Sequence, residues 1–272
     1  MTRAVWWSFI FCYLLQFTLH TTHAQIPVFR NLETIGQGRT RALLQANQII
    51  NVFVWNIHKA EDTQWFSDTT NIIGNKDFVL FQEAVYPDEI VDFFRGLGPF
   101  EWAMASSFRL INSDFSRTGV TTASKYKSSN REVITTMYTE PVVSTPKVSL
   151  YTTYQTKKGE LLVANVHAIN FVSDFNFLIE LIRIEKRLAK HKGPLILGGD
   201  FNTWSSSRTR LLKEMAERHN LNAVPFADRE RRITLGYPLD HIYYRGLTLL
   251  KREDLSYINS SDHLPLSVQF QL

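Results

Sequence analysis

Short, almost continuously apolar segments recur along the 272-residue chain. Three of them cover residues 51–56, 77–83 and 195–199, and each ends in Asn, Glu or Gly. A short apolar run bounded by such residues predicts a strand that is buried on both faces. Alternating or β-branched stretches predict further strands at 118–123, 131–138, 148–154, 160–167, 239–244 and 264–270.

Apolar residues at helical spacing predict helices between several of these strands. Asp62 can cap a helix that Gly74 closes, and Pro87 can occupy the first turn of the next. Residues from Ser173 to about 190 form a long amphipathic pattern, and residues 205–219 form another. Strands that alternate with helices around a β-rich middle indicate a mixed α/β protein. We expect a lead-in at 25–50 and one folded domain at 51–272, because no Pro- or Ser-rich linker divides the chain.

Residues 1–24 have the pattern of a secretory signal peptide. An uncharged stretch follows Arg3, and the segment ends at a small residue, Ala24, which predicts cleavage there. The alternative is an uncleaved membrane anchor. Gln16 and the short length disfavour it, since a spanning helix needs about 20 apolar residues. We therefore expect no integral membrane segment after cleavage.

The only cysteine, Cys12, lies inside this predicted signal peptide. The mature protein would then form no disulfide and could offer no thiol nucleophile and no Cys-ligated zinc. A secreted protein without disulfides suits a bacterial envelope better than a eukaryotic secretory pathway. The predicted location is therefore secreted or periplasmic.

Composition and charge are those of a soluble globular protein. The chain is 44% hydrophobic, and its 30 basic and 26 acidic side chains give a formal net charge of +4. This mild basicity permits a polyanionic partner without requiring one. The helix from Ser173 carries Arg183, Lys186, Arg187 and Lys190, which we place on its outer face. These cations predict either a polyanion footprint or an ordinary solvated face.

Polar residues stand at or near the ends of the predicted strands, where an apolar core would not select them. They are Asn56, Glu83, His167, Asp200 with Asn202, Asp240 with His241, and Asp262 with His263. Each has an ordinary explanation as a turn residue, a helix cap or a core histidine. Ligands of open α/β sheets bind at strand ends, so the whole set predicts a common site.

The residue types at these strand ends also indicate a chemistry. Glu83 with amide and carboxylate neighbours is an all-oxygen set that suits Mg²⁺ or Mn²⁺. Asp200 can take a proton from water, Asn202 can orient that water, and a charged histidine can bind a phosphoryl oxygen. Phosphoester hydrolysis needs these parts. The sequence contains no phosphate loop, no Gly-x-Ser-x-Gly elbow and no His-Glu-x-x-His motif, which disfavours an NTPase, a serine hydrolase or a zinc protease.

The order of these motifs resembles the endonuclease/exonuclease/phosphatase superfamily, which has a DNase I-like fold. The resemblance covers residues 51–270 and rests on Trp55-Asn56, Gln82-Glu83, Asn165-Val-His167, Gly199-Asp-Phe-Asn-Thr203, Leu239-Asp-His-Ile242 and Ser261-Asp-His263. Residues 164–171 and 244–246 are closest to the YafD-like bacterial subgroup. The resemblance implies a four-layer α/β/β/α sandwich, two packed mixed sheets flanked by helices.

The same resemblance implies roles for individual residues. Glu83 resembles the main metal ligand, and Asn56 and Asp262 resemble supporting metal ligands. Asp200 and Asn202 resemble the pair that activates water and steadies the phosphate. His263 resembles a phosphate-binding histidine oriented by Asp240. His167 resembles the second histidine of the DNase-like and sphingomyelinase-like branches; His58 stands where some members carry an acid, and His241 has no expected role.

The predicted activity is that of a secreted or periplasmic, Mg²⁺- or Mn²⁺-dependent phosphodiesterase. A nuclease acting on nucleic-acid phosphodiesters as a monomer is preferred over a lipid hydrolase, because no long insertion for membrane contact is visible. The alternatives are a phospholipase, a sphingomyelinase or a phosphoinositide phosphatase. A non-catalytic binding module on the same scaffold is a further alternative, which the intact polar set disfavours.

Overall fold

The computed structural model describes residues 25–27, 31–38, 43–110, 116–141, 144–157 and 159–272. The predicted signal peptide and Cys12 lie outside the described residues. Among the helices that are described, none is long and apolar enough to cross a membrane.

Within the described residues, two large sheets of eight and six strands form the centre of the molecule. The first sheet has the order β1-β5-β6-β4-β3-β16-β15, with β2 also paired to β5, and the second has the order β11-β14-β10-β9-β8-β7. The first sheet's strands are β1 (Gln25–Pro27), β2 (Leu32–Ile35), β3 (Ile49–Asn56), β4 (Phe78–Val85), β5 (Glu101–Leu110), β6 (Arg117–Ser124), β15 (Thr248–Glu253) and β16 (Leu266–Gln271). The second sheet's strands are β7 (Asn130–Thr135), β8 (Val148–Thr156), β9 (Gly159–His167), β10 (Leu195–Asp200), β11 (Asn222–Ala223) and β14 (Asp240–Arg245).

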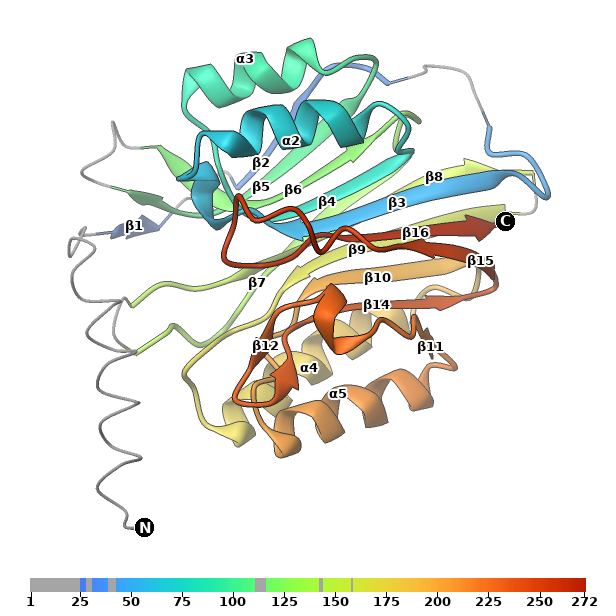
Figure 1. The fold of residues 1–272 in the computed structure, drawn as a ribbon. Coiled ribbons are helices and arrows are strands. Elements are labelled where there is room, and N and C mark those ends of the chain that lie inside the picture. The colour runs from blue at the N-terminus through green and yellow to red at the C-terminus, as the bar shows by residue number, and fades with distance from the viewer. Residues whose placement is uncertain (1–24, 28–30, 39–42, 111–115, 142–143, 158) are drawn as a thin grey trace.

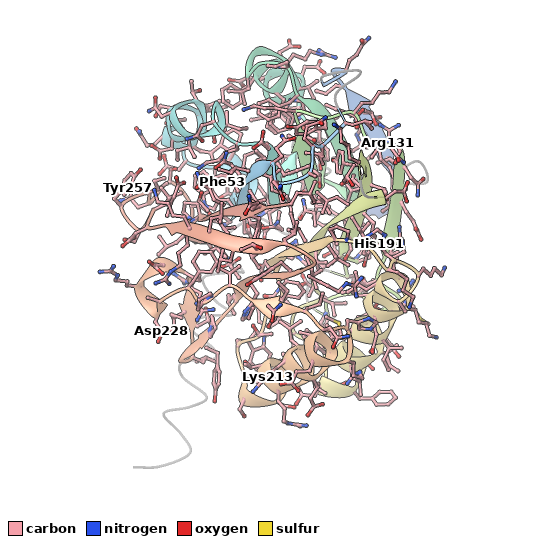
Figure 2. The ribbon with its side chains drawn as sticks, turned by 90° about the vertical axis from the view of Figure 1, so that its right-hand side faces the viewer. Phe53, Arg131, His191, Lys213, Asp228 and Tyr257 are labelled. Carbon is pink, nitrogen blue, oxygen red and sulfur yellow. The ribbon has the colours of Figure 1, made fainter. Side chains whose placement is uncertain are left out.

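Helices cover both outer faces of this pair of sheets (Figure 1). The helices are α2 (Gln64–Ile73), α3 (Asp88–Gly96), α4 (Asp174–Leu188) and α5 (Ser206–Arg218), and η1 (His58–Ala60) and η2 (Asp228–Glu230) are short 3₁₀ turns. A small hairpin, β12 (Ile233–Thr234) and β13 (Tyr237–Pro238), precedes β14. In Figure 2, Phe53 lies in the upper half of the molecule and Lys213 lies on α5 at the opposite face. The predicted four-layer sandwich is confirmed.

Alternating side chains of the central strands enter two different cores. In β3, Val52 and Val54 face the second sheet, whereas Phe53 and Trp55 pack with α2 and α3. In β10, Ile196 joins the core between the sheets, and its neighbours on either side pack under α4 and α5. A strand that is covered on both faces must be apolar at every position, which explains the continuous runs in the sequence.

Four strands of the first sheet were not predicted, namely β1, β2, β5 and β15. The lead-in segment contributes β1 and β2, which pair with β5, and β15 pairs with the last strand. β15 lies at the sheet edge, and much of it is exposed and charged. Edge strands of this kind carry no apolar pattern, so hydrophobicity could not reveal it.

The basic outer face predicted for α4 is wrong in part. Arg187 is buried, with its Nε 2.5 Å from Glu132 Oε2 and its guanidinium over the Tyr151 ring. Arg183 donates to the Thr135 carbonyl oxygen and to Glu180. Of these partners, Glu132 and Thr135 belong to β7, so two of the four cations hold this edge strand to the helix.

Candidate active site

Three predicted site residues form one row across the ends of neighbouring strands. Asp200 at the end of β10 is the register partner of His167 on parallel β9 and of Asp240 on antiparallel β14. Residues paired across adjacent strands project from the same face of the sheet. Strand register alone therefore brings these side chains together, although 73 residues separate the first from the last.

The two glycines before Asp200 permit close packing of β10 rather than the approach of a ligand. A Cβ on Gly198 would lie 3.0 Å from Val54 Cγ2 in the other sheet. A Cβ on Gly199, which has a φ of +145°, would lie 1.9 Å from the carbonyl oxygen of Val166. The glycine pair therefore lets β10 fit between the first sheet and β9, and so fixes the position of Asp200.

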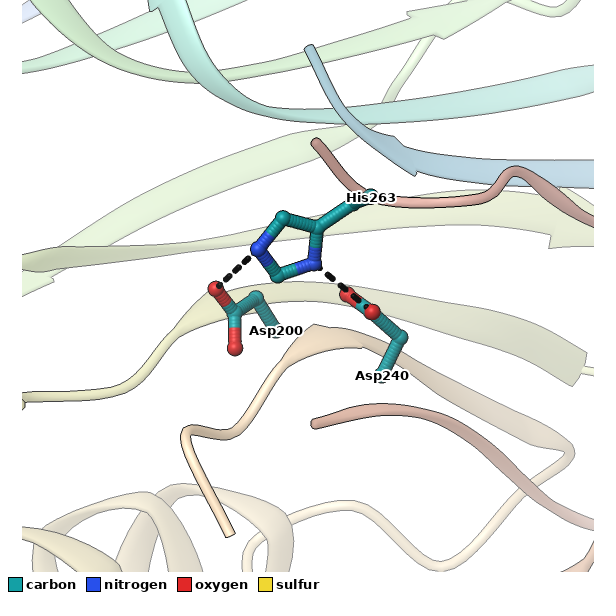
Figure 3. Close-up of side chains that lie close together, drawn as sticks. All are labelled: Asp200, Asp240 and His263. Atoms are coloured by element: carbon teal, nitrogen blue, oxygen red, sulfur yellow. Dashed lines mark hydrogen bonds and ion pairs between the residues drawn. The ribbon is translucent and has the colours of Figure 1, made fainter. Parts of the chain in front are cut away.

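His263 and Asp240 form a buried pair beside this row (Figure 3). His263 Nδ1 lies 2.8 Å from Asp240 Oδ2, and its Nε2 lies 3.9 Å from Asp200 Oδ2. Burial opposes the charged imidazole, but the Asp240 carboxylate outweighs it and raises the pKa of His263 to about 10. His263 is therefore a cation at neutral pH, with its Nε2 directed at Asp200.

Asp200 is buried among polar neighbours. Its Oδ1 accepts from the Asn202 backbone N–H at 2.9 Å, and its Oδ2 accepts from Asn56 Nδ2 at 3.0 Å. Burial raises the pKa of Asp200 to about 7, and the nearby Asp240 carboxylate adds to this rise. A carboxylate with that pKa can accept a proton near neutral pH.

His167 differs from His263 in its charge. Its Nε2 lies 3.7 Å from Asp200 Oδ2 and 3.9 Å from Glu83 Oε1. Burial, followed by the charge of Lys147, holds the pKa of His167 well below its usual range. The site therefore contains one charged and one neutral histidine.

The first sheet contributes Asn56 and Glu83 from the ends of β3 and β4. The β4–β6 pairing shifts between Phe81 and Ala84, and Glu83 inside this bulge has a φ of 50°. Such a bulge re-aims a side chain. It leaves Asn56 Nδ2 3.4 Å from Glu83 Oε1 while the same nitrogen donates to Asp200, so Asn56 links the two sheets at the site.

The loop before β16 is held against β3. Ser261 Oγ donates to the Asn56 carbonyl oxygen at 2.7 Å, and Trp55 Nε1 donates to the His263 carbonyl oxygen at 3.0 Å. Asp262 is directed differently from His263, because its half-exposed carboxylate lies 3.9 Å from His58 Nδ1. The predicted Ser-Asp-His motif thus places its two charged members on opposite sides of one loop.

Comparison with known protein families identifies the family of this chain. A sequence model of the Endonuclease/Exonuclease/phosphatase family matches residues 53–263. The chain belongs to this family. The family resemblance read from the motifs is confirmed, and with it the DNase I-like fold.

Relatives and solved structures agree with the family assignment. A UPF0294 protein of Vibrio campbellii is 37% identical over 228 residues, covering 82% of this chain and 78% of that protein. An endonuclease/exonuclease/phosphatase structure from Beutenbergia cavernae superposes with a TM-score of 0.62 at 14% identity, covering 83% of this chain and 72% of that one. D. rerio TDP2, solved with a single-strand DNA product, gives a TM-score of 0.56 at 14% identity, covering 83% of this chain and 100% of that one.

In this phosphoesterase family member, two groups of residues could hold a cation. The first contains Asp200, Asp240 and His263, whose ligand atoms all lie within 4.8 Å of one another. His263 Nδ1 is bonded to Asp240 there, which leaves only Nε2 of this imidazole to face a cation. The second is the set predicted from the sequence, Glu83 with Asn56 and Asp262. Its carboxylate and amide oxygens are ligands that suit a hard divalent cation, although Asn56 turns its Nδ2 towards Glu83 and its Oδ1 accepts from the His58 backbone N–H.

Several residues that shape the site have no role predicted from the sequence. Gln82 Nε2 donates to Asn165 Oδ1 at 2.7 Å between the sheets, and both residues belong to the quoted motifs. Arg208 is buried and donates to the carbonyl oxygens of Ile169, Asn202 and Val172. It thereby joins the loops that follow β9 and β10. A buried arginine on α5 gives no sequence signal that separates it from the exposed arginines on the same helix.

Two further histidines have distinct surroundings. His241, which has no predicted role, is buried with its Nε2 2.8 Å from Thr203 Oγ1, and burial lowers its pKa to about 3. It holds Thr203 beside Asn202 and is neutral. His58 is partly exposed in the loop after β3, with its Nε2 3.9 Å from Glu61 Oε2.

Proposed function

We propose that this protein is a divalent-metal-dependent phosphodiesterase in which Asp200 activates the attacking water. The observation that carries the proposal is the placement of Asp200 between a charged histidine, His263, and the oxygen donors around Glu83. A phosphoryl group in that space would have a base on one side and cations at its oxygens. Preorganised charges of this kind stabilise the transition state of phosphoryl transfer.

The reaction follows from the positions of these groups. Asp200 takes a proton from water as the water oxygen bonds to phosphorus and the bond to the leaving oxygen breaks. His263 Nε2–H faces the phosphoryl oxygen, while Asp240 keeps the imidazole charged and oriented. His167 is neutral and can donate one N–H to a second phosphoryl or leaving oxygen. A divalent cation held by Glu83, Asn56 and Asp262 would supply further neutralisation of phosphoryl charge.

A nucleic-acid backbone is the first substrate class in this proposal. Its support is the likeness of fold to D. rerio TDP2, whose structure holds a single-strand DNA product. The basic residues predicted on the outer face of α4 do not support a nucleic-acid substrate. Two of these cations are engaged with β7, and Lys186 stands 13 residues beyond Ser173, about 20 Å along the helix from its N-terminal end.

A lipid-headgroup phosphodiester is the second substrate class, and one observation favours it. Large apolar side chains are exposed on segments at the same edge of the sheets as the site. Met137 is 67% exposed, Phe175 66% and Leu235 69%. Met137 lies in the loop after β7, and Phe175 lies in the first turn of α4, which follows the loop after β9. Leu235 is at the tip of the β12–β13 hairpin. Side chains of this kind can contact a lipid surface without a long insertion.

One panel tests the proposed function and separates its substrate classes. Metal-stripped protein is supplied with Mg²⁺ or Mn²⁺ and given plasmid DNA, single-stranded DNA, RNA, sphingomyelin vesicles and phosphoinositides. Cleavage of nucleic acid alone supports the nuclease, and cleavage of vesicle lipid alone supports the second class. Full activity in excess EDTA would contradict the metal dependence. Failure on all substrates at high protein concentration would favour the non-catalytic alternative.

Location and assembly are part of the same proposal. Cleavage after Ala24 would leave Gln25 as the mature N-terminus, with the protein outside the cytoplasmic membrane and residues 51–272 as its catalytic domain. Intact-mass measurement of protein from the native host tests this. A mass that retains residues 1–24 would indicate an anchor instead. Light scattering during gel filtration tests the expected monomer.

A further inference from the structure

A lysine stands at the carboxylate that would be the main metal ligand. Lys59 Nζ lies 3.3 Å from Glu83 Oε2 and 3.8 Å from Glu61 Oε1. The Lys59 side chain is 30% exposed, and Asp262 also acts on its charge. One ammonium group therefore sits among three carboxylates, two of which belong to the oxygen set that fits a divalent cation.

The backbone holds this lysine in place by an unusual conformation. His58, Lys59 and Ala60 have φ values of 43°, 58° and 55°, so three consecutive non-glycine residues are left-handed. Residues rarely adopt this region, and such runs persist only where the surroundings hold them. Ile57 N donates to the Gln82 carbonyl oxygen at 3.0 Å, and His58 N donates to Asn56 Oδ1 at 3.1 Å. The loop is thus fastened to β3 and β4 on the side that faces Glu83.

We infer that Lys59 is a loop-held cation that neutralises Glu83 and must leave this carboxylate when a divalent cation binds. The inference rests on the proposed function, because it takes Glu83 as a metal ligand. Lys59 Nζ lies 3.3 Å from Glu83 Oε2, so a divalent cation on the same carboxylate would lie within a few ångströms of the ammonium group, and the repulsion between the two positive charges sets the two contacts against each other. Lys59 therefore sets the metal affinity of the site and keeps it low.

The competing explanation is a purely structural ion pair. The charge of Lys59, ahead of that of Lys147, outweighs burial and holds the pKa of Glu83 well below its usual range. A structural pair would lose folding stability when broken and would leave metal binding unchanged or weaker. If Lys59 instead competes with the metal ion for Glu83, removing Lys59 should raise the affinity of the site for the metal. The two explanations differ in the sign of the change in affinity.

Direct metal binding distinguishes them without any substrate. Mn²⁺ binding to the metal-stripped protein is measured by electron paramagnetic resonance, with Mg²⁺ competition, for the wild type, Lys59→Met and Lys59→Arg. We expect Lys59→Met to bind Mn²⁺ at least about tenfold more tightly, because a single charge at contact distance is removed. Lys59→Arg keeps the charge and should stay within about threefold of the wild type.

A second lysine provides a matched control. Lys147 also acts on the charge of Glu83, but its own contact is with Glu140 Oε2 at 3.3 Å. Lys147→Met removes a nearby charge without freeing Glu83, so it should change Mn²⁺ affinity by no more than about threefold. An equal gain in both methionine variants would show a general charge effect and would overturn the assignment to Lys59.

Two outcomes separate this inference from the proposed function. If Lys59→Met binds Mn²⁺ no more tightly than the wild type, while Glu83→Gln abolishes binding, the metal site stands and the inference is wrong. If Glu83→Gln binds Mn²⁺ like the wild type, the metal site itself is misplaced and both fail. Circular-dichroism melting confirms that each variant is folded before its affinity is compared, and Lys59→Gln replaces Lys59→Met if that variant does not fold.

Discussion

The Nδ1 of His263 lies 2.8 Å from Oδ2 of Asp240, and one residue is in a strand of the second sheet while the other is in a loop attached to the first. Asp240 begins β14 in the second sheet, and His263 lies in the loop that precedes β16 of the first. The other carboxylate oxygen, Asp240 Oδ1, is buried and has no hydrogen-bond partner among the residues that are described. The pair therefore joins the two sheets at the point where Asp200 lies.

The first prediction follows from this pair. His263→Ala should lower kcat by about 10²–10³, because it removes a preorganised donor to the phosphoryl group. Asp240→Asn should be nearly as harmful, since it lowers the pKa of His263 and frees its ring. Steady-state kinetics of both single variants and of the double variant provide the measurement. The double variant should be little worse than His263→Ala, because coupled residues are lost as a unit. Losses that simply multiply would show that the pair is not coupled.

The second prediction concerns the glycines of β10. Gly199→Ala should destabilise the fold by about 3 kcal/mol or more, because its Cβ would lie 1.9 Å from the Val166 carbonyl oxygen and φ is unfavourable for alanine. Gly198→Ala is the matched control. Its Cβ meets only side-chain carbons, of which Val54 Cγ2 at 3.0 Å is the nearest, so about 1–2 kcal/mol is expected. Urea unfolding of both variants measures the difference. Equal stabilities would mean that β10 can shift to accept either side chain.

The third prediction concerns the buried arginine of α5. Arg208→Met should keep apolar contact with Phe177 and Trp204, but it removes the cation over their rings and leaves three backbone carbonyl oxygens without this donor. A loss of stability of about 2–4 kcal/mol is expected, together with a lower kcat, because Asn202 is on one of the joined loops. Arg210, exposed on the same helix, gives the control. Arg210→Met should change neither quantity, and a matching loss there would refute a specific role for Arg208.

The fourth prediction concerns acid stability. The unfolded chain binds a proton at His241 near pH 6.5, whereas in the folded protein burial lowers the pKa of His241 to about 3. Below pH 6.5 the unfolded state therefore takes up more protons, and stability should fall as the pH falls towards 3. The slope from this one group approaches about 1.4 kcal/mol per pH unit.

His241→Gln provides the test of that slope. Glutamine can still hydrogen-bond Thr203 but does not titrate, so its stability should fall less steeply between pH 6 and pH 4 than that of the wild type. Chemical unfolding at several pH values measures both curves. Parallel curves would show that His241 contributes nothing to the acid sensitivity.

The strands that the sequence predicts most clearly are those that are buried on both faces. β3, β4 and β10 lie between two cores, so most of their positions are apolar and the polar residues near their ends stand out. The same contrast identified the strand-end residues that the structure brings together, including His167, Asp200 and Asp240. Edge strands such as β15 lack the contrast and were missed.

The other features of the site depend on the conformation of loops and on contacts between side chains of different elements. Neither can be predicted from the pattern of residues within one segment. Lys59 reaches Glu83 only because three residues of its loop are left-handed. Arg187 was placed outside because its helical position is beside other cations, but Glu132 and Tyr151 cover it. In both cases the deciding partner is on another element, so no pattern within the segment could identify it.

In the proposed mechanism, Asp200 activates water for metal-dependent phosphodiester hydrolysis. The most direct test of this mechanism is the turnover of bis(p-nitrophenyl) phosphate, with Mg²⁺ or Mn²⁺ restored to metal-stripped protein, by the wild type and by Asp200→Asn. Asparagine keeps the size of the side chain and an oxygen to accept from the Asn202 backbone N–H, but its amide group no longer accepts from Asn56 Nδ2, so the variant should fold with a lowered melting temperature. We predict that Asp200→Asn lowers kcat by about 10²–10⁴ at a temperature where circular dichroism shows it to be folded. Wild-type turnover by a folded Asp200→Asn variant would contradict the account.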